Sequence, residues 1–462
     1  MLGIIAGGRK REQLLNSIEL IKSPAINRRG AVNAYLASLI GALLNAADTF
    51  LNPLIVLPLF ALKVSASLHS IALISATGAV SWFAALLCGS AIGRLIPRQQ
   101  VANIIAAVFR AGAIALLAYE LSHGSTRNSD RLHLFFLCYV VYSAARGLSR
   151  EPSVSALSHA LSGGRARAAS WLALAAGGVL SIAAGLIVRR ALAPDGPGFA
   201  KNFSLIFACS AAALTAATFF LTCIRDTGGA HQPIGAKALP TGIANALSAP
   251  VMRRFLAFRM ALALLAGADP FFMVYAMREL KMPQTEAGVF VAVYAAAMLI
   301  SAPVWHGLMR RAGNRVALQT VAAIRILAPL VALTLPSVVK SRVYTDHVHN
   351  PRVEFYIFAA VFGALGMTAR GYSLSGSSYI AELAPARHYD AYAFLANCTL
   401  LVAGFTPLIA ASIVTANGFQ RLFLATTIAG LIAVLSSGLL GETHARARTA
   451  ARALPSRGAR SA

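Results

Sequence analysis

Two carboxylates stand out because they lie inside apolar stretches of the sequence. Asp48 falls within GALLNAADTFLNPLIVLP, and Asp269 falls within ALALLAGADPFFMVYA. An ionised carboxylate at such a position costs about 2.5 to 3.5 kcal/mol or more on membrane-insertion scales. Each carboxylate can take up and release a proton or contact a polar ligand. Equally, each can cap a helix break, because Pro53 and Pro270 follow them.

Two arginines interrupt other apolar stretches at a related depth. Along their helices, Arg110 and Arg325 differ from the aspartates by about 7 to 8 Å in predicted depth. A long guanidinium side chain can span most of that gap. Asp48 with Arg110, and Asp269 with Arg325, are therefore candidate ion pairs within the membrane. The alternative is that each arginine only binds backbone or carboxylate groups between helices.

Composition excludes an ordinary soluble enzyme. The 462 residues are 57% apolar and 12% charged, whereas a soluble domain of this size has roughly a quarter of its residues charged. The formal net charge of +25 comes from basic residues between apolar runs, where topology signals lie. We therefore predict no nucleic-acid partner. The cysteines show no metal-ligand spacing, and Asp346-His347-Val348-His349 is more simply a solvated outer loop than a metal site. We therefore predict no metal and no cofactor.

The apolar runs predict an all-α polytopic membrane protein with twelve transmembrane helices. The predicted spans are 33–62, 70–93, 101–121, 132–145, 169–188, 203–224, 255–276, 288–309, 316–335, 355–369, 391–415 and 422–440. Lysine and arginine gather on the side that holds both termini, which predicts that the termini are cytoplasmic.

The domain organisation follows from these spans. We predict a cytoplasmic tail at 1–32, a six-helix half at 33–224, a cytoplasmic linker at 225–252, a second six-helix half at 253–440 and an Arg-rich cytoplasmic tail at 441–462.

The two halves repeat each other. Ala145-Arg146-Gly147 recurs as Ala369-Arg370-Gly371, and the two aspartates and two membrane arginines recur in the same order. With six helices per half, both halves begin on the same side of the membrane. The repeats are therefore parallel, related by an axis along the membrane normal.

At this point the sequence resembles the major facilitator superfamily. The family has a loop motif, G-x-L-x-D-R-x-G-R-R, after the second helix and again after the eighth. The copies here run from Gly89 to Arg98 and from His306 to Arg315. The acidic position is Gly93 in one copy and Arg310 in the other. The resemblance implies a gating role for Gly89, Gly93, Arg94, Arg98, Arg310, Arg311, Gly313 and Arg315.

The resemblance also implies a shared cavity, lined by the first, fourth, seventh and tenth helices. Asp48 and Asp269 would face this cavity. Arg146 and Arg370 would stand at its inner mouth, where they attract an anion, clamp a gate or reach toward lipid phosphate. Further candidates for the lining are Asn45, Asn52, Tyr139, Tyr142, Phe271, Phe272 and Tyr275. Core packing is the alternative explanation for the aromatic members.

The expected function is that of a secondary transporter rather than an enzyme. It would move a small organic solute, anionic or zwitterionic, across a bacterial cytoplasmic membrane by alternating access. Protons are the expected coupling ion, with Asp48, Asp269, Arg110, Arg325, Arg146 and Arg370 as substrate or proton-coupling residues. The expected partners are the solute, protons and the lipid bilayer, and the expected state is a monomer. A membrane receptor or assembly partner that has the fold but does not transport is the alternative.

Overall fold

The computed structural model describes residues 24–65, 67–95, 99–124, 127–149, 164–224, 239–339 and 352–441. Among these residues there are helices and no strands. Eight of the described helices are long and apolar enough to cross a membrane. The chain is an all-α polytopic membrane protein, as predicted. Most of the predicted tails and part of the predicted linker, together with Arg98, lie outside the described residues.

The N-terminal half, as the name is used below, runs from α2 to α9. Its helices are α2 (Pro24–Phe50), α3 (Val56–Val64), α4 (Leu68–Leu95), α5 (Gln99–His123), α6 (Asn128–Leu148), α8 (Gly164–Ala191) and α9 (Lys201–Cys223). Helix α2 begins inside the segment predicted as a tail. The α2–α3 break contains Pro53, and the Asn52 Oδ1 there accepts a hydrogen bond from the Leu54 backbone N–H at 2.9 Å.

The C-terminal half runs from α10 to α17. Its elements are α10 (Leu239–Ser248), α11 (Pro250–Leu265), η1 (Ala266–Ala268), α12 (Asp269–Arg278), α13 (Glu286–Arg325), α14 (Leu327–Val339), α16 (Arg352–Leu383), η2 (Ala386–His388) and α17 (Tyr389–Gly438). Helix α10 lies within the segment predicted as a linker.

Two long helices in this half are each interrupted by a glycine. Gly313 in α13 has φ 89° and Gly418 in α17 has φ 81°. Positive φ is the region that glycine adopts without the steric cost of a Cβ. Each long element is therefore two successive helices joined at a kink. Their order agrees with the predicted spans, while the number of membrane crossings stays a prediction.

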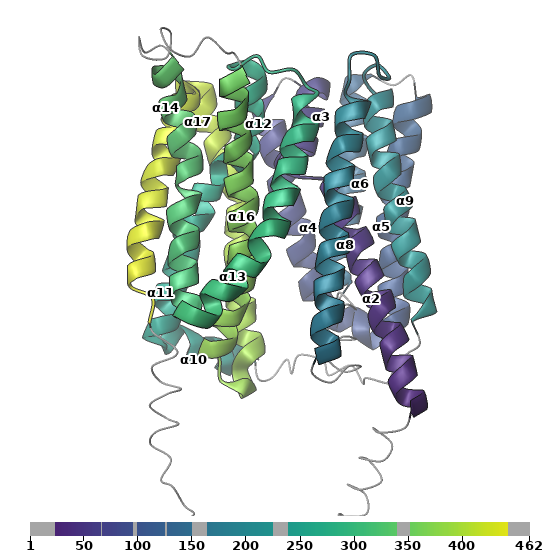
Figure 1. Ribbon diagram of the computed structural model, residues 1–462, viewed down its shortest axis with the longest axis vertical. Coiled ribbons are helices and arrows are strands. Elements are labelled where there is room, and N and C mark those ends of the chain that lie inside the picture. The colour runs from purple at the N-terminus through teal and green to yellow at the C-terminus, as the bar shows by residue number, and fades with distance from the viewer. Residues whose placement is uncertain are drawn as a thin grey trace, which may run out of the picture.

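The two halves lie side by side, with α8 and α13 next to each other where they meet (Figure 1). The start of α2 and the end of α17 lie at the same end of the bundle, which we call the termini end. The other end is called the far end. Helices α3 and α12, which continue the breaks in each half, pack against each other at the far end.

A core shared by both halves closes the far end. It includes Phe60 from α3 and Phe271 from α12, both 0% exposed. Toward the termini end the buried apolar residues divide into smaller clusters, each within one half, such as those around Ile40 and Phe255. Burial of apolar surface therefore joins the halves at the far end, while toward the termini end they also meet through the ring pairs Phe83–Phe394 and Trp171–His306.

Small residues allow the close approach of α8 and α13. A Cβ on Gly185 would lie 2.6 Å from the backbone N of Ala292, and Gly288 faces the backbone of Arg189 even more closely. Side chains larger than hydrogen do not fit at such separations. The seam between the halves therefore depends on glycine at these positions.

We predict that Gly185→Ala lowers the stability of the protein by about 1 to 3 kcal/mol, because the new methyl group overpacks the seam. Gly112 on α5 has nothing within 4 Å of its Cβ position. Gly112→Ala is therefore the control, with unchanged or slightly increased stability, since alanine favours a helix. Thermal unfolding of the purified protein in detergent measures both. Equal effects of the two substitutions would contradict a tight α8–α13 seam.

Candidate functional site

In the N-terminal half, Asp48 is surrounded by donors from two other helices. Its Oδ1 lies 2.5 Å from Arg110 Nη2 and accepts a hydrogen bond from the Tyr142 hydroxyl, also at 2.5 Å. Its Oδ2 lies 3.1 Å from Arg146 Nη2. Arg110 Nη2 also donates to the Tyr142 hydroxyl at 3.1 Å. Both carboxylate oxygens are thus engaged.

The helices explain this convergence. Tyr142 and Arg146 are four residues apart on α6, so they project from the same helix face. Arg110 is only 5% exposed on α5, and its guanidinium carbon lies 4.9 Å from the Tyr142 ring centroid. The site carries two arginines and one carboxylate, which leaves one positive charge. Arg110 is the buried member of this set, whereas Arg146 is 48% exposed, so removal of Asp48 would leave the charge of Arg110 uncompensated.

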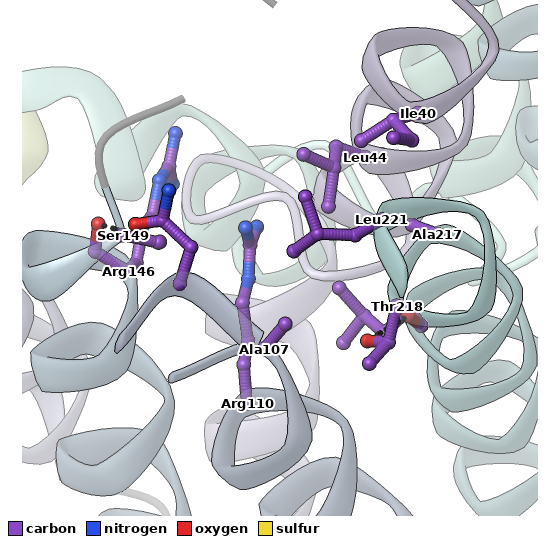
Figure 2. Close-up of a pocket in the computed structure, with 11 residues that line it drawn as sticks. Ile40, Leu44, Ala107, Arg110, Arg146, Ser149, Ala217, Thr218 and Leu221 are labelled. Carbon is purple, nitrogen blue, oxygen red and sulfur yellow. Dashed lines mark hydrogen bonds between the residues drawn. The ribbon is translucent and has the colours of Figure 1, made fainter. Parts of the chain in front are cut away.

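A small pocket adjoins this N-terminal site. Its volume is about 40 Å³, which is enough for one or two water molecules. Figure 2 shows Arg110 and Arg146 on one side of this space, with Ile40, Leu44 and Leu221 on the other. The pocket is too small for an organic solute.

In the C-terminal half, Asp269 pairs with Arg325. Arg325 Nη2 donates to Asp269 Oδ2, and Arg325 Nη1 lies 3.4 Å from the Thr368 Oγ1. Asp269 begins α12 after the η1 break, and Arg325 is the last residue of α13. An acid at a helix N-terminus and a base at a C-terminus both complement the helix dipole. Both side chains are largely buried, at 16% and 14% exposure.

The two sites differ although the sequence repeats. Arg146 reaches Asp48, whereas its counterpart Arg370 makes no ion pair with Asp269 among the described residues. The Nε of Arg370 is buried without a hydrogen-bond partner there. The structure thus brings the predicted residues together as a triad of charges in one half and as a pair in the other.

Arg259 on α11 is a buried arginine that the sequence analysis did not single out. It is 6% exposed. Its Nε donates to Thr399 Oγ1 at 2.8 Å, and its Nη2 donates to the Ala396 carbonyl at 2.7 Å. Its guanidinium carbon lies 5.6 Å from the Phe255 ring centroid and 5.3 Å from that of Tyr372. Its position inside an apolar run was the feature of the sequence that could have indicated a buried arginine.

Arg259 borders a larger cavity of about 300 Å³, which we call the C-terminal cavity. Asp269 and Arg325 also line it, and Leu54 reaches it from the N-terminal half. The complete lining is Leu54, Arg259, Leu262, Ala263, Ala266, Asp269, Tyr294, Val321, Arg325, Thr368, Ala369, Tyr372, Thr399, Leu400 and Ala403. This volume is at the lower end of ligand pockets, so a small solute fits it.

No family model and no curated protein matches the sequence. Solved structures do match. An inward-facing bacterial homologue of the iron transporter ferroportin gives a TM-score of 0.65 at 15% identity, covering 88% of this chain and 98% of that one. The nucleoside transporter NupG, as its D323A mutant, gives 0.64 at 11% identity, covering 90% of this chain and 100% of that one. An outward-facing bacterial ferroportin homologue gives 0.55 at 17% identity, covering 90% of this chain and 99% of that one.

The chain has the major facilitator fold. The similarity extends over nearly the whole length of these structures. The match therefore covers the complete fold. At such low identity, fold similarity says nothing about which solute this chain binds.

Within the major facilitator fold, most of the residues predicted to line the cavity lie elsewhere in this conformation. Phe271, Phe272 and Tyr275 are at most 3% exposed and lie in the shared core, so they line no site here. Tyr139 is also buried and stacks against Tyr142. Asn45 is exposed, and Asn52 is bonded within the helix break. Large aromatic rings gain more from burial than from facing water.

The structure gives the side-chain surroundings of the second copy of the loop motif but not those of the first. In the first copy, Gly89, Gly93 and Arg94 belong to α4, but the structure does not describe their surroundings. Arg98 lies outside the described residues. In the second copy, Gly313 forms the α13 kink, and Arg310 and Arg311 are exposed.

Hydrogen bonds beside the α13 kink join it to two other helices. Asn314 Nδ2 donates to Glu382 Oε1 at 2.8 Å, and Arg315 Nη2 donates to the Gly438 carbonyl at 3.0 Å. These contacts connect the kink to the ends of α16 and α17 at the termini end.

We predict that Asp269→Asn alone destabilises the protein by about 3 to 5 kcal/mol, because it leaves Arg325 buried without its counter-charge. The double variant Asp269→Asn/Arg325→Gln should lose less than the sum of the single variants. The exposed pair Asp195 and Arg190 is the control, and its cycle should show little coupling. Thermal unfolding of the variants measures the coupling. Additive losses at Asp269 and Arg325 would contradict the pairing.

Proposed function

We propose that the protein is a secondary transporter that moves a small organic solute, anionic or zwitterionic, by alternating access. The observation that carries this proposal is the pair of intramembrane carboxylate–arginine sites at corresponding places in the two halves, formed by Asp48 with Arg110 and Asp269 with Arg325. Charged groups inside a membrane are costly and commonly mark substrate or proton pathways. Both halves also break a helix close to these groups, a feature of transporter sites.

The packing between the halves supports alternating access. The shared core closes the far end, while the core divides toward the termini end. Two contacts across the halves add to the closure: Gln284 Nε2 to the Leu192 carbonyl, and His69 to Ser412, both at 3.4 Å. The higher TM-score to an inward-facing structure than to an outward-facing one agrees with this arrangement. Rocking of one half against the other would open the far end.

The charge of the buried sites favours an anionic group on the solute. The N-terminal site holds two arginines and Asp48, and the C-terminal cavity holds Arg259, Arg325 and Asp269. Each set therefore carries one excess positive charge. In the C-terminal cavity, where these side chains are largely buried, an unbalanced charge is costly, so an anion or the negative end of a zwitterion would be stabilised there. In the N-terminal site Arg146 is 48% exposed, so solvent meets part of its charge.

Asp48 is our candidate for proton coupling. In this conformation its two oxygens are engaged by Arg110, Tyr142 and Arg146. To accept a proton it must lose at least part of this set, through a swing of the half-exposed Arg146 side chain or a movement of α5 or α6 relative to α2. Such a requirement would link proton uptake to a change of conformation, because the two states then differ in their affinity for the proton.

We also propose that the termini end faces the cytoplasm of a bacterial cell, as the distribution of Lys and Arg along the sequence favours. Two exposed residues flank the first helix of α17: Arg387 lies in η2, just before its start, and Asn417 lies just before the Gly418 kink. In a variant without the native cysteines, Asn417→Cys should react with an impermeant thiol reagent on intact cells. Arg387→Cys should react only after the cells are opened. The reverse pattern would contradict the orientation.

We predict that Asp48→Asn abolishes proton movement driven by solute addition in liposomes that contain a pH-sensitive dye. Exchange of solute down its own gradient should survive, because that process needs no net proton transfer. The control is Asp130→Asn, since Asp130 is an exposed carboxylate at the start of α6. Unchanged proton flux in Asp48→Asn would exclude this residue. Absence of any solute flux in the unaltered protein would favour the non-transporting receptor instead.

A further inference from the structure

The two acidic sites have become chemically unlike. Asp48 has donors on both oxygens and adjoins a space of about 40 Å³. Asp269 has a donor on Oδ2 only, among the described residues, and faces a cavity of about 300 Å³. A carboxylate that is engaged on both oxygens, beside a space too small for an organic solute, suits a charge switch. A site with unfilled capacity and space suits a ligand.

Arg259 provides the binding group in that space. Its Nε and one N–H of Nη2 are used by Thr399 and the Ala396 carbonyl. Its Nη1 has no hydrogen-bond partner among the described residues, so Arg259 keeps unused N–H donors beside the cavity that it lines. The flanking rings of Phe255 and Tyr372 and the contacts to α17 fix the guanidinium in place. A fixed guanidinium loses little freedom when it binds a carboxylate.

The rest of the wall limits what else the ligand carries. Most lining residues are Leu, Ala or Val, and they surround Arg259 on several helices. The hydroxyl groups of Tyr294 and Tyr372 have no hydrogen-bond partner among the described residues and are absent from the buried unpaired atoms there. They are thus open to the cavity. The wall therefore combines one excess positive charge, a few hydroxyl groups and an apolar surface.

We propose that the C-terminal cavity binds a small monocarboxylate with an apolar body, whose carboxylate is held by Arg259. This inference rests on the proposed transport function and names the class of solute and the half that binds it. One negative charge offsets the one excess charge of Arg259, Arg325 and Asp269. A neutral solute would leave the excess uncompensated, and a dianion would reverse it. The planar guanidinium matches a carboxylate in a two-point arrangement.

Isothermal titration of the purified full chain tests the proposal with benzoate and hexanoate as probes. Benzamide serves as the neutral analogue of benzoate, and phenylalanine serves as a zwitterionic comparison ligand. We expect saturable binding of at least one of the two carboxylates and much weaker binding of benzamide. Arg259→Gln should weaken carboxylate binding by about 10- to 100-fold, in line with loss of a charge-assisted hydrogen bond. Arg421→Gln is the matched control, because Arg421 is exposed and bonds only to Asn417 among the described residues.

A second variant guards against misfolding of Arg259→Gln, since Arg259 also bonds α17. Ala403→Phe places a ring in the cavity and keeps Arg259. It should abolish carboxylate binding while thermal unfolding shows a folded protein. Failure of both carboxylates to bind, equal binding of benzamide, or full binding in Ala403→Phe would overturn the proposal. Stronger binding of phenylalanine than of either carboxylate would overturn the monoanion class.

The result is separable from that of the transport proposal. Binding of benzoate at Arg259, with no flux of any tested solute through the protein in liposomes, would refute transport and leave the site assigned. Flux of another solute that is indifferent to Arg259→Gln would refute this site and leave transport intact.

Discussion

An ionised side chain in the apolar interior must be offset by an opposite charge or by hydrogen bonds, and the arrangement of helices in each half depends on this requirement. Asp48 draws α5 and α6 onto α2 through Arg110, Tyr142 and Arg146. Asp269 and Arg325 connect α12 to the end of the second helix of α13. Arg259 connects α11 to α17 through main-chain and hydroxyl acceptors. In low-dielectric surroundings these contacts are far stronger than on a wet surface.

Both aspartates lie close to a break in a helix. A continuous helix satisfies its own backbone and presents only side chains, whereas a break frees backbone groups and changes direction. The α2–α3 break and the η1 segment place Asp48 and Asp269 next to the redirected chain in their halves. Gly313 and Gly418 serve a different purpose, because their positive φ values turn the chain sharply between successive helices. A third glycine, Gly185, permits close contact between the halves.

Depth along a helix could be predicted from sequence, but the direction in which a helix faces could not. The pairing of Asp48 with Arg110 followed from their similar depth in apolar runs, and the structure contains this contact. The approach of Arg146 to Asp48 depends on the rotation of α6, which the sequence pattern does not determine.

Two kinds of residue were harder to interpret from sequence. Arg259 lies close enough to the helix start to be read as a topology signal, and only packing shows it to be buried. Phe271 and Tyr275 occupy the core because the far end is closed, so their surroundings depend on conformation. The fold itself was predictable because apolar length and internal repetition determine it.

The shared core at the far end also determines how a solute would be sensed from each side of the membrane. Under the proposed alternating access, a solute reaches the C-terminal cavity from the far end only in a molecule in which α3 and α12 have separated and exposed apolar surface of the shared core. Exposure of that apolar surface has an unfavourable free energy, so such molecules are a minority of the population. The apparent affinity from the far side is reduced by that minority fraction, even when the contacts in the cavity are unchanged. The apparent affinity of one binding site can thus differ between the two sides of the membrane. The packing of aromatic residues that do not contact the solute would determine the ratio of these two affinities.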